Sequence, residues 1–494
     1  MTATVDARCV MLHCGKPDWD LFETMSETVN HPSSAADHHR GAVRTSVLLR
    51  YGGGQLGAQV FRDTPAVLLP LFLTTMLGVE AWIAGLVVLI PKLWLIVCDP
   101  LVGAWSDRLR GRYGRTPFLV AGAVLTSMGF VALFTLTASG SPMLSAAITC
   151  FIFFLASTAF SMFSVPYLAI AAALSHDPHE RTRIMVFRMV FSTLGVLVGV
   201  GVAQPLIYAL GGGVHGWTVM ALVLGAVCLV SMLGTALGLA KVPMIRDDTA
   251  PGSLLAQLGA IRGNRPYLVL LATCLIQNVG QAAGYTVIGF IYLYAIQAIW
   301  IVPLFILLMS IAGIASQPMW LSLSRRWGKE RTYVVASALW AAVTVTWFFI
   351  HPATDVLLTI PGVGTLGTQH VLVLLRGAVI GVVNSAFVML SLSMLTDTID
   401  YERRRRGIAN EGVFAGLFSA LEKLSFALGP VVAGLVMSAF GFVSSTGGAV
   451  TQTPHAITGI VLLYSLIPAA TQVLSLLVFS RYRLPDARLQ AAAA

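Results

Sequence analysis

Charged residues are scarce in this sequence: aspartate, glutamate, lysine and arginine together make up 11% of its 494 residues. A soluble protein carries about a quarter, so the composition excludes an ordinary soluble globule. Hydrophobic residues, at 56%, take their place. A helix needs about 20 apolar residues to cross a bilayer, so the chain has enough of them for roughly a dozen crossings. The composition predicts one polytopic membrane domain.

Cysteines and catalytic motifs are few as well. Four of the six cysteines lie in apolar segments, where cysteine behaves as a small hydrophobic side chain, so we expect no disulfide framework. The sequence has no P-loop, no HExxH motif and no GxSxG motif. These absences predict a protein that is not an enzyme and holds no cofactor and no metal. Transport would have to be driven by ion or substrate gradients.

Twelve apolar segments follow a polar stretch at the start of the chain. We place them at residues 51–77, 81–105, 117–139, 143–174, 184–209, 217–241, 267–294, 299–322, 332–351, 370–396, 412–441 and 456–480. The first begins too late for a cleavable signal peptide, and the longest linker, 242–266, divides them six and six. The sequence predicts an all-α polytopic membrane protein whose 12 transmembrane helices form two pseudo-symmetric six-helix bundles, 46–241 and 267–482, with a disordered cytosolic tail at 1–45 and a second tail at 483–494.

Lysine and arginine are distributed unevenly. All but five of the 31 lie before the first span, after even-numbered spans or in and beside the central linker. Because cytoplasmic loops hold positive charge, both termini are predicted to be cytoplasmic. The net charge of +9 is therefore a signal of topology, and we do not expect nucleic acid as a partner. The five exceptions lie inside apolar spans: Arg62, Lys92, Arg188, Arg376 and Lys423.

Polar residues inside the first span are candidates for function, since an ionisable group in a membrane is costly. Gln59 and Asp63 are four residues apart and share a helix face. Arg62 and Asp63 are adjacent and should point in different directions, so we expect each to need a partner on another helix. An ion pair that only fixes helix packing is the alternative.

A second set of charges lies in spans two and eleven. Lys92 and Asp99 are seven residues apart, on one helix face. A buried carboxylate beside a cavity can bind a proton or a cation, because burial raises its pKa and a nearby cation lowers it; a static brace is the alternative. Lys423, next to Glu422 in span eleven, is a candidate counter-ion for Asp99 or Asp63.

Three further residues could contact a solute. Arg188 lies near the inner end of span five, and Gln277 belongs to a polar stripe in span seven that could bind a hydroxyl group or another helix. Tyr167 is a possible stacking platform for a sugar ring, although aromatic residues in membrane proteins often mark interfaces.

The segment Asp99–Arg115 after span two is similar to the inner loop of the major facilitator superfamily. Further motifs follow in order along the chain: Val165-Pro166-Tyr167, Glu180-Arg181-Thr182, Arg188, Asp397-Thr-Ile-Asp400-Tyr401 and Lys423. Together with the Asp-Pro opening of the loop, they resemble the glycoside-pentoside-hexuronide:cation symporters, the family of melibiose permease.

This resemblance implies roles for residues at matching positions. Asp99 matches a carboxylate of the coupling-ion site, Lys92 the basic residue above it, and Lys423 the lysine that links the two bundles. Arg188 matches an arginine that contacts sugar. The chain departs from the family at Leu95, where a second cation-site acid is expected.

Further departures concern the sugar site. The principal sugar-binding acids and an aromatic residue of melibiose permease would fall on Gln59, Ser164 and Leu168. With one acid lost at the ion site we expect H+ as the coupling ion rather than Na+, which needs several oxygen ligands, and Asp63 could replace a lost acid. Neutral groups in the sugar site make a less polar or anionic solute plausible, because ionised acids bind hydroxyl groups more strongly.

We therefore expect alternating access in a monomeric carrier of a sugar or related small solute, in a bacterial inner membrane. The solute would lie between Gln59, Asp63, Ser164, Arg188 and Lys423, and an inner gate would contain Asp107, Arg108, Arg115, Glu180, Arg181, Asp397 and Asp400. Two alternatives remain: a carrier of lipid-like or aromatic solutes on the same fold, and a sensor or scaffold without transport activity.

Overall fold

The computed structural model describes residues 43–135, 140–174, 178–242, 263–360, 364–406 and 411–484. Residues 1–42, 243–262 and 485–494, in which the sequence predicts the two tails and the central linker, lie outside the described residues. The side chains of some helical residues, Asp107 and Arg181 among them, are not described either. The described residues all belong to one structural unit.

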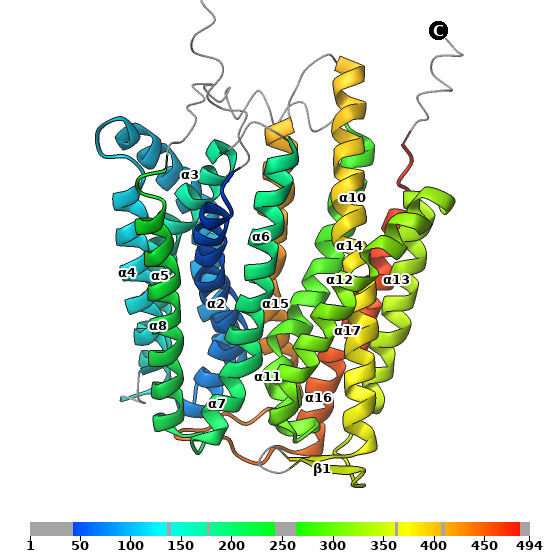
Figure 1. The fold of residues 1–494 in the computed structure, drawn as a ribbon. Coiled ribbons are helices and arrows are strands. Elements are labelled where there is room, and N and C mark those ends of the chain that lie inside the picture. Colours follow the sequence, from blue (N-terminus) through cyan, green and yellow to red (C-terminus); the bar gives the residue numbers. More distant parts are fainter. Residues whose placement is uncertain are drawn as a thin grey trace, which may run out of the picture. The chain divides into compact units, whose positions relative to one another are not determined.

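The first half of this unit is helical and runs from α2 to α8 (Figure 1). Its first four segments are single helices: α2 (Thr45–Met76), α3 (Ala81–Tyr113), α4 (Thr116–Thr135) and α5 (Pro142–Leu174). The fifth segment combines α6 (Pro178–Val196), the π-helix η1 (Leu197–Val202) and α7 (Ala203–Ala209), and the sixth is α8 (Val214–Gly238).

The second half repeats this arrangement with more interruptions. It contains α10 (Arg265–Thr286), α11 (Ile288–Phe290), η2 (Ile291–Ala295), η3 (Ile299–Ile301), α12 (Val302–Trp327), α13 (Lys329–Val345), η4 (Thr346–Phe349), α14 (Thr368–Arg406), α15 (Glu411–Ala439), α16 (Pro454–Tyr464) and α17 (Leu466–Phe479). A small antiparallel hairpin of β1 (Leu358–Ile360) and β2 (Gly364–Leu366), which the sequence did not predict, precedes α14.

The predicted all-α membrane fold is confirmed. Among the described residues, 11 helices are long and apolar enough to cross a membrane. The remaining long helix is α2, with 32 residues. It carries Gln55, Gln59, Arg62 and Asp63 near its middle, and these polar residues explain why it is less apolar than the others.

Two helices continue beyond the ends predicted from hydropathy. The hydropathy pattern predicts that span two ends at residue 105 and span ten at residue 396, whereas α3 reaches Tyr113 and α14 reaches Arg406. Arg108, Asp397 and Asp400 are therefore helical and not in loops, and this part of the prediction is wrong. The reason is that arginine and leucine are good helix formers, so a helix need not stop where the apolar sequence stops.

The helices of each half pack mainly on one another. In the first half α2 packs on α6 and α8, and α4 packs on α5 and α8; in the second half α10 packs on α15 and α17, and α12 packs on α14. The halves meet where α3 packs along α15 and where η1 packs against α12. These contacts join span two to span eleven and span five to span eight. Exchanging the two halves turns one pair into the other, so the contacts follow the internal symmetry.

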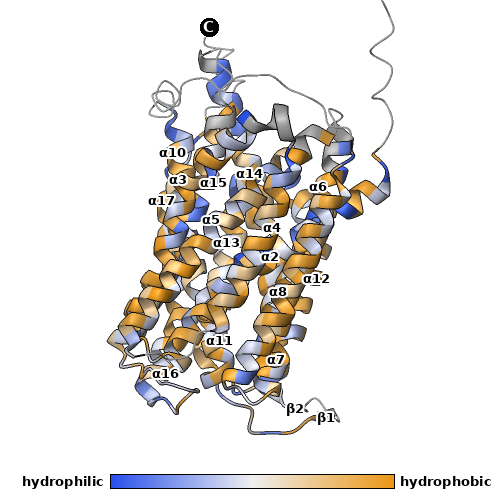
Figure 2. Cartoon of the chain, turned by 90° about the vertical axis from the view of Figure 1, so that its left-hand side faces the viewer, coloured by the Kyte–Doolittle hydropathy of each residue, from blue (hydrophilic) through white to orange (hydrophobic). Residues whose placement is uncertain are grey.

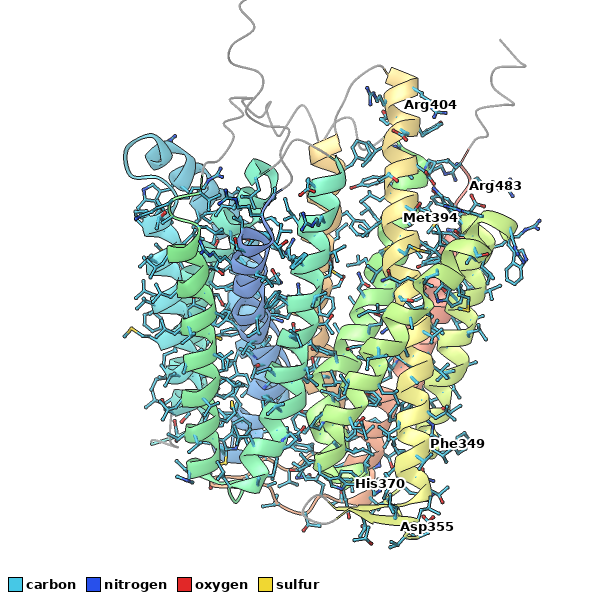
Figure 3. All side chains as sticks on the ribbon, viewed as in Figure 1. Phe349, Asp355, His370, Met394, Arg404 and Arg483 are labelled. Carbon is cyan, nitrogen blue, oxygen red and sulfur yellow. The ribbon has the colours of Figure 1, made fainter. Side chains whose placement is uncertain are left out.

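Polar residues distinguish the two ends of the helices. Hydrophobic residues run along the lengths of the helices and hydrophilic residues gather toward the ends (Figure 2). Arg404 and Arg483 lie at one end, here called the basic end, and Asp355 and His370 lie at the opposite end beside β1 and β2, here called the hairpin end (Figure 3).

The two bundles are joined at the hairpin end by backbone hydrogen bonds. The N–H of Gly78 donates to the carbonyl of Ser445, and the N–H of Ser445 donates to the carbonyl of Thr74, each at 2.8 Å. The hydroxyl of Ser444 donates to the carbonyl of Val79, also at 2.8 Å. The loop before α16 is thus hydrogen-bonded to the end of α2, and the two bundles are closed against each other at the hairpin end.

Glycines allow α3 and α15 to approach closely in the same region. A Cβ at Gly85 would lie 2.5 Å from the carbonyl oxygen of Pro430, and a Cβ at Gly434 would lie 2.3 Å from that of Ala81. Both distances are shorter than a side chain tolerates, so only glycine fits. The contact between spans two and eleven is therefore tightest toward the hairpin end.

Candidate transport site

An ion pair joins the two bundles between α3 and α15. The Lys423 Nζ donates to Asp99 Oδ2 at 2.7 Å, and the Ser161 hydroxyl of α5 donates to Asp99 Oδ1 at 2.5 Å. Both carboxylate oxygens of Asp99 thus have a partner, one from each bundle. The Asp99 side chain is 19% exposed and that of Lys423 is 48% exposed. The sequence named Lys423 as a counter-ion of Asp99 or Asp63, and in the structure it pairs with Asp99.

A chain of hydrogen bonds runs along one face of α2. The Arg188 Nε of α6 donates to Gln55 Oε1 at 3.0 Å, and Gln55 Nε2 donates to Gln59 Oε1 at 3.1 Å. Gln59 Nε2 then donates to Asp63 Oδ2 at 2.7 Å. We call Arg188, Gln55, Gln59 and Asp63 the α2 relay.

The charged ends of the α2 relay fix the orientation of its amides. Arginine can only donate hydrogen bonds, so Gln55 must present its oxygen to Arg188. An ionised carboxylate can only accept, so Gln59 must present its NH₂ group to Asp63. The Ser192 hydroxyl of α6 adds a second donor to Gln59 Oε1, at 2.8 Å. The relay is therefore a fully directed polar network in the middle of α2.

Arg62 lies at the end of the α2 relay. Its Nε donates to Asp63 Oδ1 at 3.3 Å, so the two neighbours form an ion pair. We expected adjacent residues to point apart and to find partners on other helices; this expectation is wrong for their charged groups, because the long arginine side chain turns back to the carboxylate.

The exposure of Arg62 indicates a solvent-filled space inside the molecule. Its side chain is 59% exposed, whereas every other residue of α2 from Tyr51 to Met76 is buried or half-buried. Other helices surround α2 on all sides, so the helix has no face toward lipid. The exposed surface of Arg62 must therefore open onto a space between helices.

Three more side chains gather around Arg62 and Asp63. Lys92 of α3 interacts electrostatically with both residues. Tyr285 of α10 interacts with Asp63, and Glu422 of α15 interacts with Arg62. Lys92 had been expected near Asp99, with which it shares a helix face, but its electrostatic partners are on α2. A group of charges from both bundles thus surrounds the exposed guanidinium.

The other predicted contact residues lie in different environments. Ser164 is half-buried on α5. Tyr167 is 2% exposed, stacks on Tyr51 with ring centroids 4.6 Å apart, and donates its hydroxyl to the Tyr51 carbonyl. Gln277 is 4% exposed and accepts a 2.5 Å hydrogen bond from the Tyr333 hydroxyl. The geometry of Gln277 matches the helix-to-helix alternative, and Tyr167 is packed away from any solute in this conformation.

Two of the predicted gate residues, Glu180 and Asp397, pair within their own bundles. Glu180 forms an ion pair with Arg183 at 3.5 Å and accepts a hydrogen bond from the Val43 N–H. Asp397 forms an ion pair with Lys329 at 2.6 Å. Arg108 and Asp400 are exposed, Arg115 is half-buried just after α3, and the side chains of Asp107 and Arg181 lie outside the described residues.

A surface cavity lies beside the Lys329–Asp397 pair. It has a volume of about 300 Å³ and is lined by residues around Lys329, by Met394 and Asp397 of α14 and by Tyr482. Desolvation raises the pKa of the Tyr482 hydroxyl, as do the carboxylates of Asp397 and Glu330. No group of three His, Cys, Asp or Glu side chains in the described ranges could hold a metal ion.

Sequence reasoning missed Gln55, Ser161, Ser192 and Tyr285. Gln55 could have been found, because it precedes Gln59 by four residues, the spacing that places Asp63 on the same face. The two serines and the tyrosine had no such signal, since each belongs to a different helix and meets the site only through packing.

In the described residues, twelve helical spans form two six-helix bundles, which meet where span two packs on span eleven and span five on span eight and which hold charged side chains between them. This arrangement defines a secondary transporter with the major facilitator fold. Solved transporters share this fold. A bacterial homolog of the human lysosomal transporter Spinster, in an inward-facing and unoccupied conformation, superposes with a TM-score of 0.61 at 12% identity, covering 89% of this chain and 96% of that one. A nucleoside transporter superposes with a TM-score of 0.60 at 14% identity, covering 89% and 100%.

The chain belongs to the MFS/sugar transport protein family, whose sequence profile matches residues 50–486. The isoprimeverose transporter of Lactiplantibacillus pentosus is 22% identical over 475 residues, 93% of this chain and 94% of that protein. The glucuronide carrier protein homolog of Escherichia coli is 23% identical over 439 residues, 86% and 89% of the two chains. The predicted membership among the glycoside-pentoside-hexuronide:cation symporters is confirmed, and the protein is a membrane transporter of small molecules, not an enzyme.

Proposed function

We propose that the protein is a proton-coupled symporter of a sugar or sugar-derived solute. It works as a monomer by alternating access, in a bacterial inner membrane with both termini cytoplasmic. The relatives named as symporters and sugar carriers favour this function over a lipid-like carrier or a scaffold. The observation that carries the proposal is the ion pair of Asp99 and Lys423, which ties one bundle to the other.

Protonation of Asp99 gives this ion pair a role in coupling. A proton on the carboxylate removes the charge that holds Lys423, and the released ammonium can then bind solute oxygens. The half-exposed side chain of Lys423 supports this step, because water and solute can reach it. Leu95 occupies the position of a second acid, so Asp99 is the one carboxylate of this pair. One carboxylate can bind a proton, whereas Na+ needs several oxygen ligands, and this favours H+ as the coupling ion.

The closed hairpin end supports an assignment of this conformation as inward-facing. The bonds between Gly78 and Ser445 hold that end shut. Glu180 and Asp397 meanwhile pair inside their own bundles. In the opposite conformation we propose that the gate residues of the basic end exchange these partners for partners across the interface and close the cytoplasmic side.

Uptake into proteoliposomes tests the proposal. Isoprimeverose and methyl β-D-glucuronide serve as probes, with an acidic outside and no sodium. Wild-type protein should accumulate at least one of them, and Asp99→Asn should lose accumulation while retaining exchange of labelled for unlabelled solute. Asp355→Asn, the same change outside the spans, is the matched control and should accumulate solute normally.

Two results would contradict proton coupling through Asp99. One is full accumulation by the Asp99→Asn variant. The other is accumulation by the wild type that requires sodium and ignores the pH gradient.

A further inference from the structure

One edge of the Arg62 guanidinium is held and the other is bare. Its Nε donates to Asp63, and within the described part of the chain neither Nη atom makes a hydrogen bond to protein. The side chain is 59% exposed, and α2 has no face toward lipid, so the free edge points into the space between the helices. A guanidinium edge of this kind matches the two oxygens of a carboxylate or sulfonate.

The geometry around Arg62 is set before any solute arrives. Asp63 is held from its other oxygen by Gln59 at 2.7 Å, and Gln59 is held in turn by Gln55 and Ser192. A fixed carboxylate restrains the position of the Arg62 Nε that donates to it. Preorganisation of this kind lowers the cost of ordering a charged side chain on binding.

The charged side chains around Arg62 do not prevent its free edge from binding an anion. Asp63 is engaged on both oxygens, and Lys92 adds a second positive charge to the group. Glu422 lies within electrostatic range of Arg62 but forms no ion pair with it, so it weakens the positive potential without occupying the free edge. An anionic headgroup of the bilayer cannot be the ligand, because α2 is enclosed by other helices.

We propose that the free edge of Arg62 binds an acidic group of the transported solute, and that this transporter therefore selects anionic, uronide-like solutes over neutral sugars. The inference rests on the proposed transport function and adds the chemical class of its substrate. In the alternative, Arg62 serves only as the counter-ion of Asp63, and solute charge is irrelevant.

Solute exchange at equal pH on both sides of proteoliposomes tests the inference. Methyl β-D-glucuronide and methyl β-D-glucoside differ only in a carboxylate at C6. Wild-type protein should exchange the glucuronide with a half-saturating concentration at least about tenfold lower, as expected from a charge-assisted, bidentate hydrogen bond. Equal or better exchange of the glucoside would overturn the inference.

Variants of Arg62 separate a solute contact from a structural role. Arg62→Gln should lower the ratio of glucuronide to glucoside exchange by about tenfold or more. Arg62→Lys should lower it by less, because lysine keeps the positive charge but lacks the two parallel N–H donors of a guanidinium. Glu422→Gln should move the ratio the opposite way. Arg376→Gln, which changes an arginine elsewhere in a span, is the matched control and should leave the ratio unchanged.

Folding is checked separately, because Arg62→Gln leaves Asp63 without its cation. The double variant Arg62→Gln and Asp63→Asn removes both charges and should show the same loss of preference in a protein that elutes as a single species. An unchanged ratio in both variants would overturn the inference. If the wild type exchanges the glucuronide no better than the glucoside but still takes up a neutral sugar in response to a proton gradient, the anion site is refuted and the proposed transport function stands.

Discussion

Removing the charges of Asp99 and Lys423 one at a time and together measures how strongly the two bundles are tied. Asp99→Asn leaves the ammonium of Lys423 without its carboxylate, and Lys423→Gln leaves the carboxylate with only Ser161. The double variant has two neutral groups that can still hydrogen-bond. We expect the double variant to lose less stability than the sum of the two single losses, because each single variant leaves a partly buried charge without its partner and the double variant leaves none.

The structure gives the size of this coupling. The Nζ and Oδ2 atoms are 2.7 Å apart, for which Coulomb's law gives about 6 kcal/mol at an effective dielectric constant of about 20 and about 1.5 kcal/mol in water. Lys423 is 48% exposed and Asp99 is 19% exposed, so solvent screens much of the attraction. We expect a coupling free energy of about 2 kcal/mol, or a factor of about 30 in an equilibrium constant.

Equilibrium unfolding in mixed detergent micelles at neutral pH measures the free energy of unfolding of all four proteins. Tryptophan fluorescence can follow it. The coupling is the amount by which the loss in the double variant falls short of the sum of the two single losses. Strictly additive losses would refute the reasoning, since they would show that the two charges do not interact across the bundle interface.

Two other changes test the packing between bundles and the cap of α14. Gly434→Ala places a Cβ against the carbonyl of Ala81 and should lower the free energy of unfolding by about 1–3 kcal/mol; unchanged stability would contradict the close approach of α3 and α15. Hydrogen bonds from Thr368 lower the pKa of Asp355, so its stabilising effect should be present above the unfolded pKa of about 3.9 and be lost as the pH falls through the lower folded value. The difference in melting temperature between wild type and Asp355→Asn should therefore vanish in strong acid, and a difference that grows on acidification would refute this assignment.

The sequence alone determined the number of spans, their division into two halves and the family. Each of these depends on a local or summed property. A segment is driven into a membrane by its own hydrophobicity, and the placement of lysine and arginine depends on each loop separately. The rare charges within the spans were visible for the same reason, because Asp99 and Lys423 stand out against apolar neighbours.

Only the tertiary structure decided which of these charges meet. Asp99 and Lys423 are 324 residues apart in the chain, and the position of Lys92 on the same helix face as Asp99 did not make them partners. Membrane helices are apolar around most of their circumference, so their sequences do not mark which side faces a neighbour. Contacts across helices follow from how 12 such surfaces pack, and that packing buried Tyr167 while leaving Arg62 open to the interior.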